Sequence, residues 1–260
     1  MSSSLLSPDL SAYRDMTRHL PSAGEFVIES TMVIERALQS TWKVHSVVGT
    51  PNRLERLRPL SQPHTVFLTL PQAELNELVG FPLHRGCAAH VEVPSIIGLP
   101  TPKLLKQAQR IVLAEGLSDP ANIGSLLRNA RAFGVDLVVL DPKGGSPFCR
   151  KAARASAGHL FGQPFCVHPP LDALETLRAV HGERLTTIGA SVGPKARPLY
   201  EEHTGPPWLF CLGNEGSGLS SLILRKLDKE VTIPMSGNVD SLNVAAASAV
   251  LLYELAGRLS

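Results

Sequence analysis

Short apolar runs alternate with polar segments along the whole chain, and their lengths and spacing predict both strands and helices. In the first hundred residues, strands are expected at 26–28, 44–48, 65–69 and 87–93. Residues 32–38 and about 72–79 have the apolar spacing of helices, so these elements predict a compact αβ layer. Three prolines and a glycine between Pro94 and Pro102 then indicate a linker.

The second half of the chain alternates more regularly. Apolar runs at 110–115 and 136–140 flank a helix, as expected for a parallel sheet that is covered on both faces. Further strands are expected at 185–190, 208–212 and 230–233, followed by a last helix from Ser241 to about Leu259. The predicted fold class is therefore α/β, with a smaller α/β domain at 1–95, a linker at 96–107 and a parallel-sheet domain at 108–260.

Length and composition indicate an ordinary globular protein. The 260 residues, 43% of them hydrophobic, suffice for a full core in one large or two modest domains. The N-terminus has no basic start and no sustained apolar stretch, and the acidic Asp9 and Asp15 are unlike a transit peptide. No later run is long enough to span a bilayer, so a cytoplasmic location is expected.

The cysteines lie far apart and lack paired C-x-x-C spacing, which favours reduced, mostly buried thiols over a zinc ribbon or a disulfide framework. They are Cys87, Cys149, Cys166 and Cys211. His84, Cys87 and His90 are each separated by two residues, a spacing found among metal ligands. Because they lead into apolar residues, structural roles are the favoured interpretation. No metal site is predicted.

The formal net charge of +2 is too small to identify a nucleic-acid-binding protein. Its distribution is more informative, because residues 142–171 contain basic side chains and no acidic one. The basic residues are Lys143, Arg150, Lys151 and Arg154. They are candidate contacts for RNA phosphates, although a solvated helix face explains the charge equally well.

Residues 119–129, DPANIGSLLRN, have the design of a helix start. Asp119 is expected to cap a helix whose first turn accepts Pro120. The expected apolar stripe consists of Ile123, Leu126, Leu127 and Ala130. Arg128 lies off this stripe, with Gly124 one turn earlier, and is suited to clamp a phosphate or to stabilise negative charge on a ribose oxygen. A lone helical arginine is more often a surface residue.

Residues 212–219, LGNEGSGL, place three glycines after an apolar strand. Such a loop is tight, and its backbone can approach a ligand closely. The G-x-x-G-x-G spacing after a late strand differs from the dinucleotide fingerprint, which requires an opening strand and a downstream acidic partner. Glu215, between the glycines, is either a group that orients a basic side chain or a ribose hydroxyl, or a loop carboxylate in water.

Residues 233–243, IPMSGNVDSLN, place a polar loop between a strand and the final helix. Ser241 is expected at the N-cap of that helix. Ile233, Met235 and Leu242 would supply apolar walls and Asn243 a polar contact, although isolated Ile and Leu residues here would be ordinary core.

Together and in this order, the three motifs resemble the signature motifs of the SpoU/TrmH family (SPOUT superfamily), the RNA ribose 2′-O-methyltransferases. The resemblance covers Gln109 to the C-terminus and includes 154–158, RASAG, and Ala190-Ser191. Residues 26–29, 44–48 and 84–86 resemble the ribosomal-protein-like substrate-binding domain of members that modify ribosomal RNA. Ser30 departs from the family pattern, where glycine is usual, and so does Ala245, where serine is usual.

The resemblance implies a deep trefoil knot, which no sequence pattern would predict. It also implies S-adenosylmethionine bound among the knot loops, and a homodimer whose site receives residues from both subunits. Matched positions imply cofactor contacts at Leu212, Gly213, Gly218, Ile233, Met235 and Leu242. They imply catalytic or substrate-orienting roles for Asn122, Arg128, Glu215, Ser241 and Asn243.

The implied reaction is an in-line attack by a ribose 2′-oxygen on a sulfonium methyl group, which requires alignment and loss of a weakly acidic proton but no metal. A guanidinium is a poor base, so Arg128 is expected to stabilise the incipient alkoxide while the substrate phosphate assists activation. Ribosomal RNA is favoured over transfer RNA because of the extra N-terminal domain.

Three alternatives stay open. One is a transfer-RNA 2′-O-methyltransferase, and another is a non-catalytic RNA-binding relative, against which the intact Arg128, Glu215 and Asn243 argue. The third is an ordinary nucleotide-dependent α/β enzyme, against which the missing G-x-G-x-x-G and the motif order argue.

Overall fold

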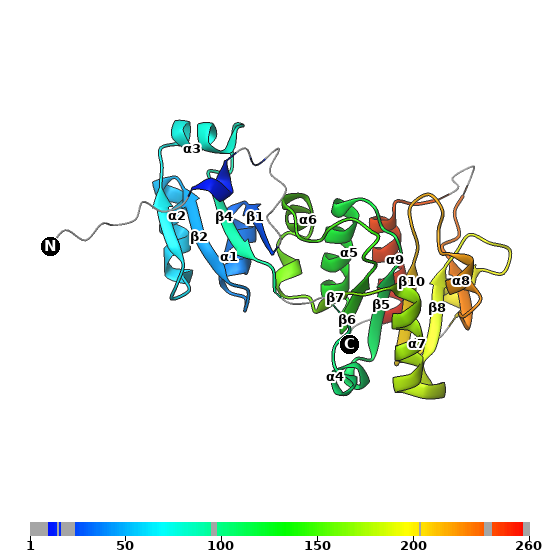
Figure 1. The fold of residues 1–260 in the computed structure, drawn as a ribbon. Coiled ribbons are helices and arrows are strands. Elements are labelled where there is room, and N and C mark those ends of the chain that lie inside the picture. Colours follow the sequence, from blue (N-terminus) through cyan, green and yellow to red (C-terminus); the bar gives the residue numbers. More distant parts are fainter. Residues whose placement is uncertain are drawn as a thin grey trace. The chain divides into compact units, whose positions relative to one another are not determined.

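The chain forms two compact units in the computed structural model, which describes residues 10–14, 16, 24–94, 98–202, 204–236 and 241–256 (Figure 1). The first unit comprises Met1–Pro94 together with Phe148–Gly162, and the second comprises Ser95–Pro147 and Gln163–Ser260. The chain therefore enters the first unit a second time, with a segment that the sequence-based division placed in the domain at 108–260. Each unit is described separately below.

The first unit is built on a four-stranded sheet with the order β1-β4-β2-β3. Its strands are β1 (Glu25–Glu29), β2 (Val44–Gly49), β3 (Val66–Thr69) and β4 (Cys87–Glu92). The strands β1 and β2 pair antiparallel with β4, and β2 pairs parallel with β3, so β1, β2 and β3 all end at the same edge. After each of these ends a helix begins: α1 (Thr31–Leu38), α2 (Pro51–Leu57) and α3 (Gln72–Val79). Two short turns, η1 (Ser11–Tyr13) and η2 (Arg58–Leu60), complete this part.

The returning segment of the first unit carries α6 (Arg150–Ala155) and the turn η3 (His159–Phe161). Its two phenylalanines join an aromatic cluster with Phe26 of β1 and Trp42: the Phe26 ring lies 6.2 Å from Phe148 and 6.4 Å from Phe161, and Trp42 lies 5.1 Å from Phe161. Large rings bury much apolar surface and favour such offset and edge-on contacts. This cluster explains why the segment packs with the first unit.

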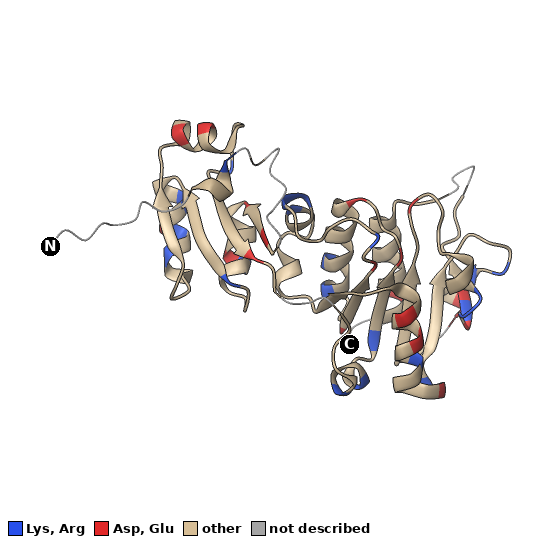
Figure 2. Cartoon of the chain, viewed as in Figure 1, with Lys and Arg blue, Asp and Glu red and all other residues tan. Residues whose placement is uncertain are grey.

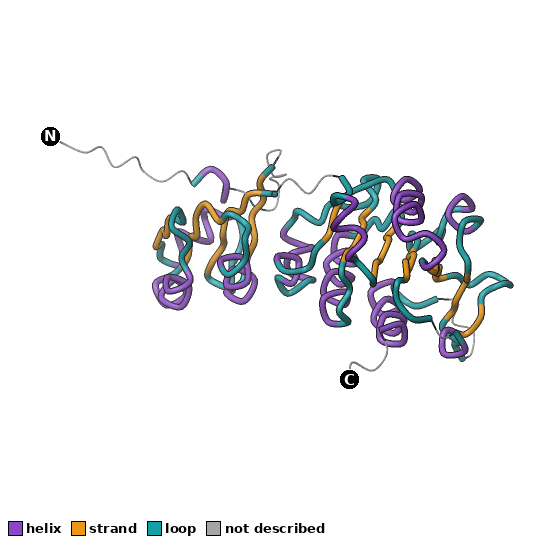
Figure 3. Tube along the Cα trace, turned by 90° about the horizontal axis from the view of Figure 1, so that it is seen from below, coloured by secondary structure: helices purple, strands orange, loops and turns teal. Residues whose placement is uncertain are grey.

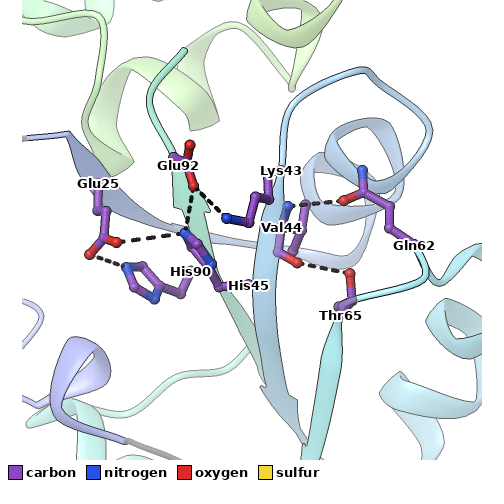
Figure 4. Close-up of polar contacts among 8 residues, drawn as sticks. All are labelled: Glu25, Lys43, Val44, His45, Gln62, Thr65, His90 and Glu92. Carbon is purple, nitrogen blue, oxygen red and sulfur yellow. Dashed lines mark hydrogen bonds and ion pairs between the residues drawn. The ribbon is translucent and has the colours of Figure 1, made fainter. Parts of the chain in front are cut away.

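Gln62, which follows α2 and η2, is hydrogen-bonded to the segment that connects α1 to β2 (Figure 4). Its side-chain oxygen accepts from Val44 N at 3.0 Å, and its nitrogen donates to the carbonyls of Leu38, Ser40 and Trp42. One half-buried amide thus satisfies several backbone groups that follow the end of α1, where helix carbonyls lack partners of their own.

The second unit is built on a seven-stranded sheet with the order β7-β6-β5-β10-β8-β11-β9, in which every neighbouring pair is parallel. The strands are β5 (Arg110–Ala114), β6 (Leu137–Leu140), β7 (Phe165–Val167), β8 (Thr186–Ala190), β9 (Arg197–Pro198), β10 (Trp208–Leu212) and β11 (Lys229–Thr232). The α/β class and the parallel sheet are as predicted. The completely buried run Trp208–Leu212 shows why, because strands covered on both faces are continuously apolar.

Helices lie on both sides of this sheet (Figure 3). They are α4 (Pro102–Gln107), α5 (Pro120–Ala132), α7 (Pro170–His181), α8 (Ser221–Leu224) and α9 (Val244–Ala256), with the turns η4 (Gly182–Arg184) and η5 (Leu199–Glu201). Leucines of α4 and α7 share one buried cluster with β5, β6 and β10. The helices α5 and α9 pack against each other, and Asn129 of α5 donates to Ala245 O and Ser248 Oγ of α9, both at 2.9 Å.

The helix start at Asp119 is confirmed: Asp119 Oδ1 accepts from Ala121 N at 2.8 Å, and Pro120 is the first residue of α5. The predicted N-cap at Ser241 is wrong. α9 begins at Val244, and Asn243 Oδ1 accepts from Ala245 N at 2.9 Å, because an asparagine side chain adjacent to the first turn caps it well. Among the described helices, none combines the length and apolar character needed to cross a bilayer.

Candidate functional site

A cavity of about 540 Å³ opens in the second unit at the carboxyl ends of β8, β10 and β11. In open parallel sheets, ligands bind at this edge of the strands. Three chain segments form most of its wall: 190–192, 212–219 and 231–244 as far as that segment is described. Leu224 of α8 and Ala247 and Leu251 of α9 complete the lining. All six expected cofactor residues lie in its wall, as do Glu215, Ser241 and Asn243. Gly237, Asn238, Val239 and Asp240 of the third motif lie outside the described residues.

The loop after β10 is organised by the side chain of Asn214. Its Oδ1 accepts from the backbone nitrogens of Gly216 at 2.9 Å and Ser217 at 3.1 Å. Its Nδ2 donates to Gly116 O, in the loop after β5, at 2.8 Å. Asn214 and Gly218 also exchange two backbone hydrogen bonds. This closed loop presents its backbone to the cavity.

Gly213 allows that loop to close. A Cβ atom on Gly213 would lie 2.1 Å from the carbonyl carbon of Gly218 and 2.2 Å from Leu219 N, far inside van der Waals contact. Gly218 has a φ of +67°, a conformation that glycine adopts without steric cost. The tight turn expected from the glycine spacing is therefore present.

A chain of polar side chains leads from the cavity wall to α5. Asn122 Nδ2 donates to Glu215 Oε1 at 2.8 Å, and Asn243 Nδ2 donates to Asn122 Oδ1 at 3.2 Å. The second carboxylate oxygen of Glu215 accepts from both the backbone nitrogen and the hydroxyl of Ser118, each at 3.2 Å. The structure thus brings together one expected residue from each of the three motifs.

The carboxyl of Glu215 is held in its ionised form. Partial burial raises its pKa, but the hydrogen bonds from Asn122 and Ser118 together outweigh that effect, and the pKa lies below its usual value. At neutral pH, Glu215 is therefore an acceptor whose position is fixed by several donors.

Arg128 lies apart from this group. It is exposed on α5 and is not among the residues that line the cavity. In the described part of the chain, the Arg128 side chain makes no hydrogen bond or ion pair, whereas the side chain of its neighbour Asn129 is bonded to α9. A single subunit therefore does not bring Arg128 into the cavity wall.

The four candidate RNA-contacting residues divide into two groups. Lys143 is an exposed residue of the second unit. Arg150, Lys151 and Arg154 lie on α6 in the first unit, where Arg154 Nη1 bonds to Glu29 Oε1 at 3.0 Å and Arg150 Nη1 lies 3.9 Å from Glu29 Oε2. Arg150 and Arg154 thus share Glu29 as an intramolecular partner, which the absence of acidic residues in their own segment did not predict.

His84, Cys87 and His90 do not converge. Cys87 and His90 lie three positions apart on β4, so their side chains point to opposite faces of the sheet. Cys87 Sγ lies 3.5 Å from Thr31 Oγ1, and His90 Nε2 lies 3.0 Å from Glu25 Oε2. Among the described residues, no group of three or more His, Cys, Asp or Glu side chains is arranged to hold a metal ion.

Comparison with known proteins identifies the family. The model described as "SpoU rRNA Methylase family" matches residues 109–253, more than half of the chain. This chain belongs to the SpoU family. An uncharacterized tRNA/rRNA methyltransferase of Mycobacterium tuberculosis is 30% identical over 259 residues, which cover 95% of this chain and 88% of the relative. The 23S rRNA (guanosine(2553)-2′-O)-methyltransferase RlmP of Bacillus subtilis is 31% identical over 166 residues, 64% of this chain and 65% of the relative.

A solved structure is similar over nearly the whole length of this SpoU chain. The SpoU methyltransferase AviRb from Streptomyces viridochromogenes, in complex with the cofactor AdoMet, superposes with a TM-score of 0.76 at 25% identity, over 95% of this chain and 96% of that one. The SpoU protein described here is thus an RNA methyltransferase, and the cavity lies within the stretch that the family model matches.

Several residues of the SpoU site were not predicted from the sequence. Asn214 and Ser118 hold the loops, and Val192, Ala247 and Leu251 add to the cavity wall. For Asn214 a signal existed, because an asparagine side chain in a glycine-rich turn commonly bonds to the backbone two residues on, here Gly216. For Ala247 and Leu251 there was none, since apolar residues on a helix read as core whether or not they border a cavity.

Proposed function

We propose that this SpoU chain transfers a methyl group from S-adenosylmethionine to a ribose 2′-hydroxyl of ribosomal RNA. The observation that carries the proposal is a cavity whose wall contains Glu215 and Asn243, which Asn122 of α5 joins by hydrogen bonds beside the glycine loop. The 2′-O reaction on 23S rRNA named for the Bacillus subtilis relative supports the reaction type. Transfer RNA is the second candidate, because several relatives are described as tRNA/rRNA methyltransferases.

The residues of the cavity fit the cofactor. A volume of about 540 Å³ lies within the range of pockets that hold small molecules. Leu212, Ile233, Met235 and Leu242 give apolar walls suited to an adenosine ring, while the loop from Gly213 to Gly218 offers backbone groups at close range. Bound there, S-adenosylmethionine supplies an electrophilic methyl group on a sulfonium centre.

The polar chain is suited to orient the nucleotide that receives the methyl group. Ionised Glu215 accepts hydrogen bonds, and Asn243 and Ser241, both in the cavity wall, offer further polar groups to a ribose. Alignment of the 2′-oxygen with the methyl carbon is the main requirement of an in-line transfer. Fixing these side chains through Ser118 and Asn122 reduces the entropy that must be lost in the transition state.

In this proposal, Arg128 stabilises the alkoxide that begins to form on the ribose 2′-oxygen. A guanidinium stays protonated and cannot accept the hydroxyl proton, but it stabilises negative charge on the 2′-oxygen while the substrate phosphate assists loss of the proton. Since Arg128 of one chain does not line that chain's own cavity, the proposal includes a homodimer in which the arginine comes from the partner.

The surface of α9 supports such a dimer. The helix is apolar on nearly all sides, and Val250 and Tyr253 are 46% and 51% exposed. A helix that is apolar all round is normally buried, so a second subunit would cover this side. The proposal also includes a trefoil knot, formed by the segments that line the cavity, and a substrate-binding role for the first unit.

The test is transfer of labelled methyl from S-adenosylmethionine to separately purified large-subunit ribosomal RNA, small-subunit ribosomal RNA and transfer RNA. Label on one ribosomal RNA, mapped to a ribose, is expected for the wild type, with a loss of about 10² or more in kcat for Arg128→Ala. Arg131→Ala, an exposed arginine on the same helix, is the matched control and is expected to retain activity. Label on a base, or on transfer RNA alone, would contradict the proposal.

A mixing experiment tests the shared site. Arg128→Ala supplies an intact cavity without the arginine, and Gly213→Val supplies the arginine with a blocked loop. If each site combines residues from two chains, a mixture refolded together recovers activity that neither variant has alone. No recovery, with dimers shown by sedimentation, would place the arginine in its own subunit's site.

A further inference from the structure

Three arginines of the first unit contact Glu29 or Ser30, at the edge where β1 ends, and a fourth, Arg53, lies beside Gly86. Arg154 and Arg150 approach the two carboxylate oxygens of Glu29 at 3.0 and 3.9 Å. Arg85 Nη1 donates to Ser30 Oγ at 2.9 Å. Arg53 packs over Gly86, next to Arg85 in the chain: its Cγ lies 3.2 Å from the point where a Cβ on Gly86 would stand. We call Arg53, Arg85, Arg150 and Arg154 the arginine edge.

The arginine edge carries more positive charge than the protein neutralises. Glu29 is only 6% exposed and is the single carboxylate bonded to any of the four guanidinium groups in the described residues, which leaves a surplus of three positive charges. Neither Arg53 nor Arg85 pairs with a carboxylate within the described ranges, and the nearby Glu35 is engaged by Arg56 at 3.5 Å.

Two of these guanidinium groups are held in place. The Arg150 guanidinium stacks over the ring of Phe81 at 4.6 Å, and its Nη1 is buried with no hydrogen-bond partner among the described residues. Arg154 is fixed by Glu29 yet keeps half of its side chain exposed. A planar arginine that is already oriented loses less entropy when it binds a phosphate, and its fork of donors matches two phosphate oxygens.

We infer that the arginine edge is a binding surface for the phosphates of the RNA substrate. Blue stretches of the ribbon on α2 and α6, and red ones on α3, show that charged residues are unevenly distributed in the first unit (Figure 2). The inference rests on the proposed function, because it takes RNA as the partner. It gives Arg150 and Arg154 two roles, binding Glu29 and facing the RNA. It also adds Arg85, from the motif at 84–86, and Arg53, which lies in none of the sequence motifs.

The experiment measures binding of full-length protein to purified ribosomal RNA over a range of salt concentrations. The double variant Arg53→Ala/Arg85→Ala is expected to raise the Kd roughly tenfold, and to reduce the slope of log Kd against log salt by about 1 to 2, since each phosphate contact contributes about 0.7 to 0.9. The control Lys43→Ala removes one cation just before β2, at the opposite end of that strand, and is expected to leave both values unchanged. Arg53→Lys/Arg85→Lys is expected to restore the salt slope.

Binding and methyl transfer are read separately. In the double variant, the affinity for S-adenosylmethionine and kcat at saturating RNA should equal those of the wild type, while KM for RNA rises. Wild-type methylation with unchanged RNA affinity in the double variant would overturn the inference and leave the proposed function intact. A lower RNA affinity in the double variant, with no methyl transfer by the wild type to any RNA, would support the inference and contradict the proposed function. A changed sedimentation coefficient with unchanged RNA affinity would make the edge a protein interface and also overturn the inference.

Discussion

The side-chain amide of Asn214 donates to the backbone carbonyl of Gly116 over 2.8 Å and ties the loop after β10 to the loop after β5. The same loop after β5 carries Ser118, which bonds to Glu215, the residue next to Asn214. The two loops are therefore connected twice, and the cavity wall and the start of α5 share one hydrogen-bonded framework.

Asn214→Ala is expected to weaken cofactor binding more than it weakens the fold. It removes the acceptor of two loop nitrogens and the donor to Gly116, so the glycine loop loses its fixed shape. We expect the Kd for S-adenosylmethionine, measured by calorimetry, to rise roughly tenfold. Ser217→Ala, in the same cavity wall, removes one side-chain contact to Asn214 but leaves the backbone bonds to Asn214 Oδ1 in place, so the Kd should change little. Equal affinities for Asn214→Ala and the wild type would show that the loop does not need this amide.

Gly213→Ala is expected to abolish cofactor binding, because its new Cβ would overlap the backbone of Gly218 and Leu219. The loop must open to accommodate this Cβ, and its opening would also displace the cavity wall that the loop forms. Gly216→Ala is the control: its Cβ would meet only Asn214 Oδ1 at 3.5 Å, an ordinary contact. Calorimetry compares the two, and circular dichroism checks that both variants fold. Tight cofactor binding by Gly213→Ala would mean that the loop is open in the working enzyme.

Much of the second unit could be predicted because buried strands and capped helices leave local signals. Trp208–Leu212 is an unbroken apolar run with the bounds of β10, and Asp119-Pro120 marks the start of α5. The return of Phe148–Gly162 to the first unit left no such signal. It depends on rings at Phe26 and Trp42, more than a hundred residues away, and no local pattern encodes that pairing.

The site was predictable in its parts and not in its connections. Glycine spacing indicated a tight loop, and Gly213 shows the physical reason. The bond from Asn122 to Glu215 joins residues 93 positions apart, so spacing alone could not reveal it. The helix cap moved from Ser241 to Asn243 because both residue types cap well and only the backbone path decides between them.

Ser30 occupies a backbone conformation that favours glycine, with a φ of +87°. Both Ser30→Gly and Ser30→Ala lose the hydroxyl that accepts from Arg85, but only glycine relieves the backbone strain. We expect the glycine variant to be more stable than the alanine variant by about 1 kcal/mol or more in urea unfolding. At Ser61, where φ is −57°, the same pair of substitutions should give the reverse order. Greater stability of Ser30→Ala than of Ser30→Gly would show that Ser30 is not strained.

Stability of the first unit should fall as the pH drops below neutral, because of His45. Burial lowers the pKa of His45 from its ordinary value of 6.5, and the nearby His90 and Lys43 lower it further. Glu25 and Glu92 raise the pKa, but their effect is smaller (Figure 4). A lowered folded-state pKa means that the unfolded chain binds the proton more readily, so this contribution is complete above pH 6.5 and is lost as the pH falls towards the folded-state pKa.

Urea unfolding of the wild type between pH 7.5 and about 5 checks this, with His45→Gln expected to flatten the profile and the exposed His64→Gln to leave it unchanged. If stability instead increases as the pH falls, the attraction of Glu92 at 3.2 Å and Glu25 at 3.6 Å outweighs burial, and protonated His45 stabilises the sheet.

Three of the four thiols should be unreactive in the folded protein. Cys87, Cys166 and Cys211 are buried, and burial raises their pKa values, that of Cys166 to about 12. Since the thiolate is the nucleophile, both access and ionisation oppose reaction at these positions. Cys149, half-buried before α6, is expected to react first with an aromatic disulfide reagent, and the other three only as the chain unfolds. Cys149→Ser should therefore remove the fast phase. A fast phase that persists in this variant would mean that β4, β7 or β10 opens on the timescale of the reaction, because the thiols on these strands are buried in the folded protein.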